Sequence, residues 1–490
     1  MTQEALSRMS ADEKRALLRR LLAERASREA VGKSVGEVDA FPLSHAQRAL
    51  WFLQRLLPDT FAYNVALTGR FTPSLDVDAL RRAMDRLAAR HPALRTVFAE
   101  ENGQPIQRVL PSVEPRLRIV EAGEMSETEL YATVRADYER PFALDEPLAT
   151  TTVYRRDGED ILLLNVHHLV FDAWSQQILF TDLRALYAAE QRHAAAELPL
   201  READYRAFVT AQSARLDGPE GRELWANWES VFTTAPRPLE IRAALPRPAD
   251  PSMKGASVPF ALSAPTSEAL HALAKRQNTT LYTVMLAAMQ VLLFEFSGES
   301  DITIGTPVSL RTRPEWLNVV GYFINMLPMR TTVREDETFL AHLARARETT
   351  LRALEHQDFP FSLMVDRLKI RRDPSRSPIF QAMLNVIVSP RASELASLFV
   401  ADAGTSLPFG TSRLTSYVIP QQEGQFEIMI EISDSDGALR GNLKYQTDLY
   451  TTETAQRMAD SFVATLEEIV SRPDARVGEL SRLNRDSFEL

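Results

Sequence analysis

Cysteine is absent from all 490 residues of the chain, and histidine is scarce, with eight residues. Disulfides, thiolate nucleophiles and cysteine-based metal sites are therefore excluded. The small number of histidines also disfavours a metal site built on imidazole. A chain without cysteine is consistent with a cytoplasmic protein.

The sequence also lacks an excess of positive charge and long apolar runs. Its formal net charge of -10 and pI of about 5.5 give no basic footprint for nucleic acid. Charged residues 13–15 interrupt any apolar core of a secretory signal. The longest apolar stretch, Leu281 to Phe296, contains polar residues and is short for a membrane span, so it predicts a buried helix. We expect a soluble protein that binds neither nucleic acid nor membrane.

The length is too great for one compact core and predicts two lobes of mixed helix and sheet, the α+β class. We expect a helical segment at residues 1–39, an N-terminal lobe at 40–215 and a C-terminal lobe at 216–490. The proline-rich stretch from Pro236 to Pro251 is the candidate connection between the lobes.

Local patterns predict several elements. Asp157-Gly158 closes a hairpin between residues 151–154 and 161–166, and Asp436-Gly437 closes a second one between 426–432 and 439–445. Asp76 is a candidate cap for a helix that stops at His91-Pro92.

The first helix of the chain is predicted from a pattern that resembles a capping box. Ser10 and Glu13 precede a stripe of leucines at helical spacing. The stripe either packs on its own protein or docks on a partner subunit. Packing within the chain is the more frequent outcome for such a stripe.

Residues 167–174 read HHLVFDAW and follow the predicted strand 161–166. Neighbouring strand residues point to opposite faces, so His167 and His168 cannot both face one substrate. Alone, the fragment fits a metal site, a structural polar cluster or a catalytic base. A metal is disfavoured because the side chains diverge and no third ligand stands at helical spacing. A neutral imidazole, with a pKa of about 6.5, can accept a proton from an attacking amine or alcohol.

This fragment resembles the HHxxxDG signature of condensation domains of nonribosomal peptide synthetases. Further segments resemble other motifs of that family in the family's order. They are residues 44–51 (SHAQRALW), 90–98 (RHPALRTVF), 205–208 (YRAF), 320–330 (VGYFINMLPMR), 356–361 (HQDFPF) and 372–378 (RDPSRSP). The resemblance implies two chloramphenicol-acetyltransferase-like lobes in a V-shaped pseudo-dimer, with the active site in a tunnel between them.

The resemblance also assigns roles to the motif residues. It implies that His168 is the catalytic residue that orients or deprotonates the nucleophile, and that His167 is structural. Asp172 is expected to hold the motif in place by pairing with an arginine of the other lobe. Arg311 is the first candidate for that arginine and Arg313 the second, because a buried carboxylate without a partner is costly.

Four further residues are expected along the substrate tunnel. Ala173 stands where the family usually has glycine, and Trp174 follows it. If this position needs a positive φ or a very close backbone approach, the methyl group strains it or narrows the tunnel, which we interpret as altered substrate fit. Asn325 and Gln357 are placed near the tunnel, although satisfied structural polar residues are the more frequent case for each.

The expected reaction moves a peptidyl or polyketidyl acyl group from a thioester to an amine or hydroxyl acceptor and forms an amide or ester. Where the acceptor is a small molecule, the reaction releases the acyl chain from its carrier. The donor thioester is expected on the phosphopantetheine arm of an acyl or peptidyl carrier protein, and the acceptor is a small molecule or itself carrier-bound. We expect no bound cofactor, no metal and a monomer. Met1 and the first helix favour a free-standing chain.

Two alternatives remain from the sequence. The first is a stand-alone acyltransferase that makes esters from carrier or coenzyme A thioesters. The second is a condensation-like platform that recruits partners without catalysis.

Overall fold

The computed structural model describes residues 39–114, 117–242, 245–249, 251–370, 373, 375–388, 406–435 and 437–480. The predicted first helix and docking element at residues 1–38, residues 372 and 374 of one motif, and Asp436 of the second predicted turn lie outside the described residues.

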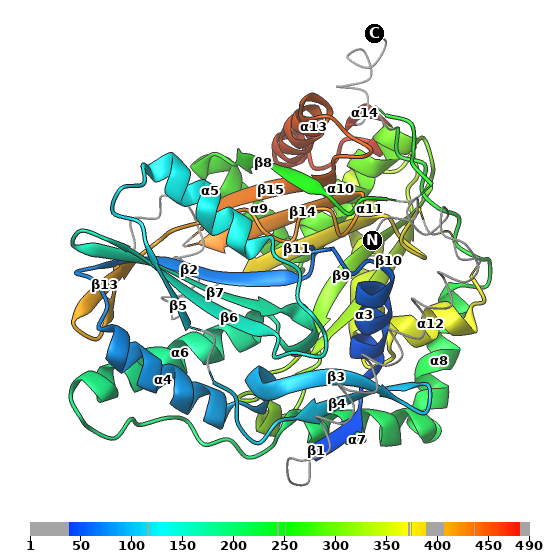
Figure 1. Cartoon of the computed structure of the whole chain (residues 1–490). Helices are drawn as coiled ribbons and strands as arrows, with labels where there is room; N and C mark the ends of the chain where they lie inside the picture. The colour runs from blue at the N-terminus through cyan, green and yellow to red at the C-terminus, as the bar shows by residue number, and fades with distance from the viewer. Residues whose placement is uncertain are drawn as a thin grey trace, which may run out of the picture.

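The N-terminal lobe is built on a six-stranded sheet in the order β12-β13-β2-β7-β6-β5 (Figure 1). Its strands are β12 (Ser406–Phe409), β13 (Ser412–Thr415), β2 (Asn64–Thr72), β7 (Glu159–His167), β6 (Ala149–Arg156) and β5 (Leu117–Glu121). Side chains of α4 (Val77–Arg90) and α6 (Ala173–Gln191) share a core with one face of this sheet, and α5 (Glu127–Tyr138) packs on the other.

Local predictions in this lobe are confirmed. Strands β6 and β7 form the antiparallel hairpin expected around Asp157-Gly158, and Gly158 takes the positive φ of 78° that this turn favours. Asp76 caps α4 by accepting a hydrogen bond from the Ala79 amide, and α4 ends at Arg90, one residue before His91.

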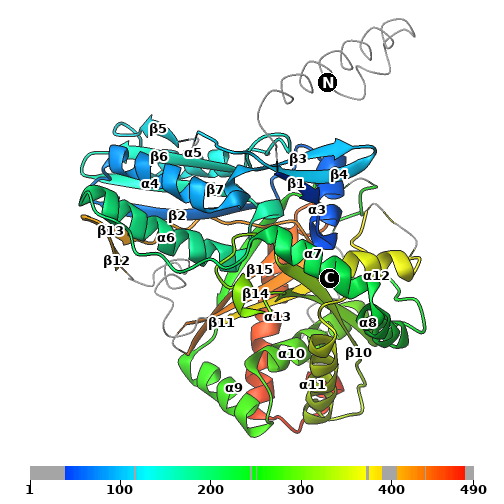
Figure 2. The ribbon, with the colours of Figure 1, turned by 90° about the horizontal axis from the view of Figure 1, so that it is seen from below.

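The C-terminal lobe contains a second six-stranded sheet in the order β10-β9-β11-β14-β15-β8. Its strands are β10 (Ile324–Thr332), β9 (Asp301–Ser309), β11 (Ala382–Val388), β14 (Ile428–Ser435), β15 (Ala438–Gln446) and β8 (Gly255–Ala261). Figure 2 shows this sheet on the opposite side of the molecule from the first one, with its helices outside it. Those helices are α9 (Ala264–Arg276), α10 (Leu281–Ser297), α11 (Phe339–Glu355) and α13 (Thr452–Ser471).

Helix α10 is the buried helix that the apolar stretch predicted. Every residue from Thr283 to Phe296 is buried, and most of them join the core of the C-terminal lobe. Among the described residues, no single helix has both the length and the apolar character needed to cross a bilayer; α9 and α10 meet those criteria only as a pair bent by 105°.

The remaining elements are a small sheet and several helices and turns. A three-stranded sheet consists of β1 (Asp39–Pro42), β4 (Gln104–Val109) and β3 (Thr96–Glu101). Helix α3 (His45–Leu56) contacts α12 (Phe361–Arg367), and α7 (Tyr205–Asp217) precedes α8 (Pro219–Val231). The short elements are η1 (Pro92–Arg95), η2 (His168–Val170), η3 (Pro314–Trp316) and α14 (Val477–Leu480).

The predicted boundary at residue 215 does not separate the two sheets. Strands β12 and β13 come from the second half of the chain, yet β13 pairs antiparallel with β2 of the N-terminal lobe. Gly69 in β2 makes room for this crossing, because a Cβ atom there would lie 2.2 Å from Leu414 Cδ1. The second half of the chain therefore contributes a strand pair to the N-terminal sheet, and the expectation of two segments consecutive in sequence is corrected.

Candidate active site

His167 is the last residue of β7, and its side chain points into the protein. Its Nδ1 accepts a hydrogen bond from the Leu169 amide at 3.0 Å, so the ring proton is on Nε2, which lies 3.2 Å from Gln54 Oε1. Burial lowers the pKa of His167 to about 3. This neutral, fully bonded imidazole holds the end of the strand, as a structural role requires.

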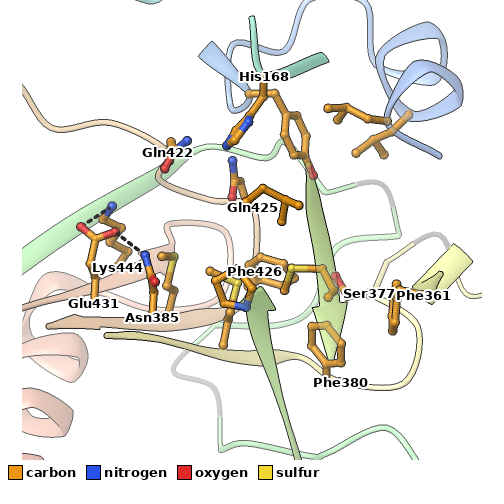
Figure 3. A pocket seen from close by; sticks show the side chains of 18 of the residues that line it. His168, Phe361, Ser377, Phe380, Asn385, Gln422, Gln425, Phe426, Glu431 and Lys444 are labelled. Atoms are coloured by element: carbon orange, nitrogen blue, oxygen red, sulfur yellow. Dashed lines mark hydrogen bonds and ion pairs between the residues drawn. The ribbon is translucent and has the colours of Figure 1, made fainter. Parts of the chain in front are cut away.

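His168 begins the turn η2, and its side chain lines the cavity between the lobes (Figure 3). Its Nδ1 lies 2.6 Å from the Phe171 carbonyl oxygen. A carbonyl can only accept, so Nδ1 carries the proton and Nε2 keeps its lone pair. Burial lowers the pKa of His168 below its ordinary value, so the ring is neutral at pH 7. The Tyr322 ring meets it edge-on, with the ring centroids 5.2 Å apart.

Asp172 joins the two lobes next to this histidine. Its Oδ1 accepts a hydrogen bond from the Ser175 amide, which caps the N-terminus of α6. Its Oδ2 accepts from Arg311 Nη1 at 2.5 Å and from the Phe323 amide at 3.0 Å. Arg311 Nη2 donates to Ser175 Oγ and to the Val319 carbonyl. The predicted Asp172–Arg311 pair is confirmed; Arg313, the second candidate, lies instead beside Trp316.

A cavity of about 2880 Å³ lies in front of His168. The N-terminal lobe contributes residues of α3, β2 and α6 to its wall, and the C-terminal lobe contributes residues of β9, β10, β11, β14 and β15. One base with a free lone pair therefore faces a large cavity that both lobes enclose.

Comparisons with known proteins identify this arrangement. The family model named Condensation domain matches residues 37–489. The chain belongs to the condensation domain family.

Curated relatives of this condensation domain are much longer proteins. A linear gramicidin synthase of Brevibacillus parabrevis is 35% identical over 443 residues, which cover 88% of this chain and 6% of the relative. Phosphinothricin tripeptide synthetase PhsC of Streptomyces viridochromogenes is 33% identical over 454 residues, which cover 91% of this chain and 41% of the relative.

Solved structures show the same fold. The four-domain nonribosomal peptide synthetase holo-AB3403, bound to AMP and glycine, superposes with a TM-score of 0.84 at 26% identity over 90% of this chain and 34% of that one. SgcC5 from Streptomyces globisporus gives a TM-score of 0.73 at 24% identity over 89% of this chain and 100% of that one. The predicted two-lobed chloramphenicol-acetyltransferase-like fold is confirmed.

Ala173 of this condensation domain does not occupy a glycine-type backbone conformation. It is the first residue of α6, and it is not among the described residues with a positive φ. Its exposed methyl group lines the cavity. The positive φ that would cause backbone strain is therefore not found, and an effect on the width of the cavity stays a prediction.

Two of the predicted tunnel residues lie elsewhere. Trp174 is 44% exposed, donates from its indole Nε1 to the Leu317 carbonyl at 2.8 Å, and is not among the described residues that line the cavity. Gln357 is likewise absent from that lining, and its backbone carbonyl accepts a hydrogen bond from Asn325. Both positions depend on how the start of α6 and the end of α11 pack in the fold, which motif resemblance alone does not reveal.

Asn325 lines the cavity but is fully engaged in structure. Its Nδ2 donates to the Gln357 and Phe359 carbonyls at 2.8 Å each, and its Oδ1 accepts from the Phe361 amide at 2.9 Å. These bonds fix the loop that leads into α12.

Several cavity residues were not predicted from the sequence. Tyr322, Gln425, Glu431 and Lys444 line the wall, the first within a recognised motif and the others outside any motif. For Glu431 a signal existed: the alternation that placed Ile430 and Ile432 on the core face also puts Met429 and Glu431 on the opposite face of the same strand.

Proposed function

We propose that this condensation domain transfers an acyl group from a thioester on the phosphopantetheine arm of a carrier protein to the amine of an acceptor, forming an amide. The relatives above 30% identity carry names of peptide-making synthetases, which favours an amine over a hydroxyl acceptor. The arm and its carrier are substrates of the reaction, and a carrier protein is the partner that delivers them.

The observation that carries this proposal is the tautomer of His168. Because the Phe171 carbonyl holds the proton on Nδ1, the Nε2 lone pair is available on the cavity side. The acceptor nitrogen attacks the thioester carbon and its proton moves to Nε2. The C–S bond then breaks and the proton passes to the departing thiolate, so that an amide and a free thiol result.

Asp172 acts in this scheme as a positioning residue. Its two oxygens are occupied by Ser175, Arg311 and Phe323, so it takes no part in proton transfer. It fixes the start of α6, four residues after His168, against the C-terminal lobe. This arrangement supports a single catalytic histidine, His168, which lines the cavity together with Ala173.

The cavity is large enough to hold two substrates at once. Its volume of about 2880 Å³ is about three times the upper end of ordinary small-molecule pockets, roughly 1000 Å³. A donor arm and an acceptor can therefore occupy it together, which acyl transfer requires.

A donor and acceptor panel tests the proposal. One acyl group is supplied on a carrier protein or on coenzyme A, and each donor is offered a primary amine or the matching alcohol. We expect amide formation from the carrier-bound donor. Equal turnover with acyl-coenzyme A, with ester as the main product, would favour a stand-alone ester-forming acyltransferase. Tight carrier binding without transfer to any acceptor would indicate a recruitment platform.

A further inference from the structure

A charged cluster forms part of the cavity wall on the side of the C-terminal sheet (Figure 3). Lys444 of β15 places Nζ 3.0 Å from Glu431 Oε1 of β14, and Asn385 Nδ2 of β11 lies 3.4 Å from Glu431 Oε2. The Lys444 side chain is 8% exposed and that of Glu431 21% exposed. We call these three residues the Glu431 cluster.

The register of the sheet explains why the three side chains meet. Asn385 is paired with Glu431 across β11 and β14, and Lys444 stands two residues along β15 from Asn442, the residue opposite Glu431. The alternate residues Ile430 and Leu443 point to the other face and pack in the core of the lobe. The cluster therefore lies on the sheet face that faces the cavity.

Apolar residues border the cluster on one side, whereas Ser433 and Arg440 continue the same face of the sheet on the other. Met383 and Met429 are paired in the adjacent row of the sheet, and Phe380 and Phe426 line the same cavity. A few convergent polar groups in an apolar pocket are the usual means of fixing one substrate orientation. Neither Glu431 nor Lys444 has a part in the His168 chemistry proposed above.

The charges of the cluster limit what it can bind. Lys444 and Glu431 neutralise each other, and Arg440, the other charged residue of β15 on this face, is exposed, so a charged substrate group held at the ion pair would meet no net opposite charge. An aliphatic group would remove water from the ion pair without replacing its hydrogen bonds, which is unfavourable. A neutral group that both donates and accepts fits best, since an N–H can reach Glu431 Oε2 while a carbonyl accepts from a second Lys444 N–H.

We infer that the Glu431 cluster selects substrates whose side chain carries a primary carboxamide. This inference rests on the proposed function for the identity of the substrate as an aminoacyl thioester. The same carboxamide chemistry can belong to the donor chain or to the acceptor. Stable analogues of aminoacyl-pantetheine, in which nitrogen replaces the thioester sulfur, separate the two: N-acetylated analogues represent the donor and free amines the acceptor.

Affinity for these analogues tests the inference without requiring turnover, so a failure of acyl transfer and a failure of the cluster are distinguishable. Kd is measured by calorimetry for glutaminyl, glutamyl and homoleucyl analogues, which have side chains of similar shape. We expect the glutaminyl analogue to bind at least about tenfold more tightly than the other two in one of the two series. The gain comes from its hydrogen bonds to the charged groups of the cluster. The series that shows the preference identifies the donor or the acceptor as its source.

Variants link the preference to the cluster. Lys444→Met and Glu431→Gln should each reduce the ratio of Kd values to within about twofold. Lys275→Met, the same change on the exposed surface of α9, should preserve the ratio. Melting temperatures check that each variant is folded. The inference is overturned if the wild-type chain binds no analogue measurably or shows no preference for the glutaminyl analogue. It is also overturned if folded Lys444→Met retains the preference.

Discussion

Arg311 Nη1 donates a hydrogen bond to the Asp172 carboxylate at 2.5 Å, and this contact joins the N-terminal lobe to the C-terminal lobe. The two side chains are 2% and 0% exposed. Asp172 also caps α6, so the carboxylate that begins a helix of one lobe is held by the loop that follows β9 in the other lobe. The position of His168 relative to the cavity therefore depends on how the lobes meet.

Replacing Arg311 should be strongly destabilising. Arg311→Met leaves Asp172 buried with an uncompensated charge, which typically lowers the free energy of unfolding by about 3–5 kcal/mol. Urea unfolding measures this loss. The matched control is Arg313→Met, whose side chain is 52% exposed and which should cost less than about 1 kcal/mol. Similar losses for the two variants would show that the pair does not hold the lobes.

His167 should make stability depend on acidity. Its pKa is about 3 in the folded chain and about 6.5 when unfolded, so the unfolded state binds the proton first as the pH falls. The free energy of unfolding therefore rises with pH between these values, by about 1.4 kcal/mol per pH unit from this residue. His167→Gln should remove that part of the slope, measured by denaturant unfolding from pH 4.5 to 6.5. His271→Gln, at a partly exposed residue, is the control; an unchanged slope in His167→Gln would refute the assignment.

Local patterns in the sequence predicted the elements whose partners are near in the chain. The hairpin around Asp157-Gly158 and the buried helix α10 both depend on neighbouring residues, and both are confirmed. The crossing of β13 onto β2 could not be predicted, because it pairs residues such as Arg413 and Thr72 and no local pattern records such a distant partner.

The site was predicted to a similar extent. Motif resemblance located the histidine pair, and strand alternation showed that only one of them faces the cavity. The Asp172–Arg311 pair followed from resemblance together with the cost of an unpaired buried carboxylate. Trp174, at the start of α6, and Gln357, in the turn after α11, were misplaced because the direction of a side chain at a helix end depends on tertiary packing.

Ala173 should influence which substrates fit. Ala173→Gly removes a methyl group from the cavity wall at the first position of α6, where the cost to stability should stay within about 1 kcal/mol. We expect a higher kcat/KM for donors with bulky acyl groups and little change for small ones. A donor series of increasing size measures this effect. An equal change for every donor would contradict a role for the methyl group in fit.

The strand crossing can be tested by a double-mutant cycle. Gly69→Ala brings a Cβ atom against Leu414 and should destabilise the chain by about 1–3 kcal/mol through overpacking. Leu414→Ala removes a buried side chain and should lower stability by about 2–5 kcal/mol. The double variant should lose less than the sum of the two, because the added methyl group then has room. Strict additivity in urea unfolding would contradict the packing of β13 on β2.

The rate of acyl transfer in a single turnover, compared between the wild-type chain and His168→Ala, tests the central claim most directly. With a carrier-bound donor and an amine acceptor, the loss of the Nε2 base should lower the rate constant by about 10²–10⁴-fold. Melting temperature and carrier affinity should stay unchanged, and His271→Ala should retain the wild-type rate. An undiminished rate in folded His168→Ala would contradict the account.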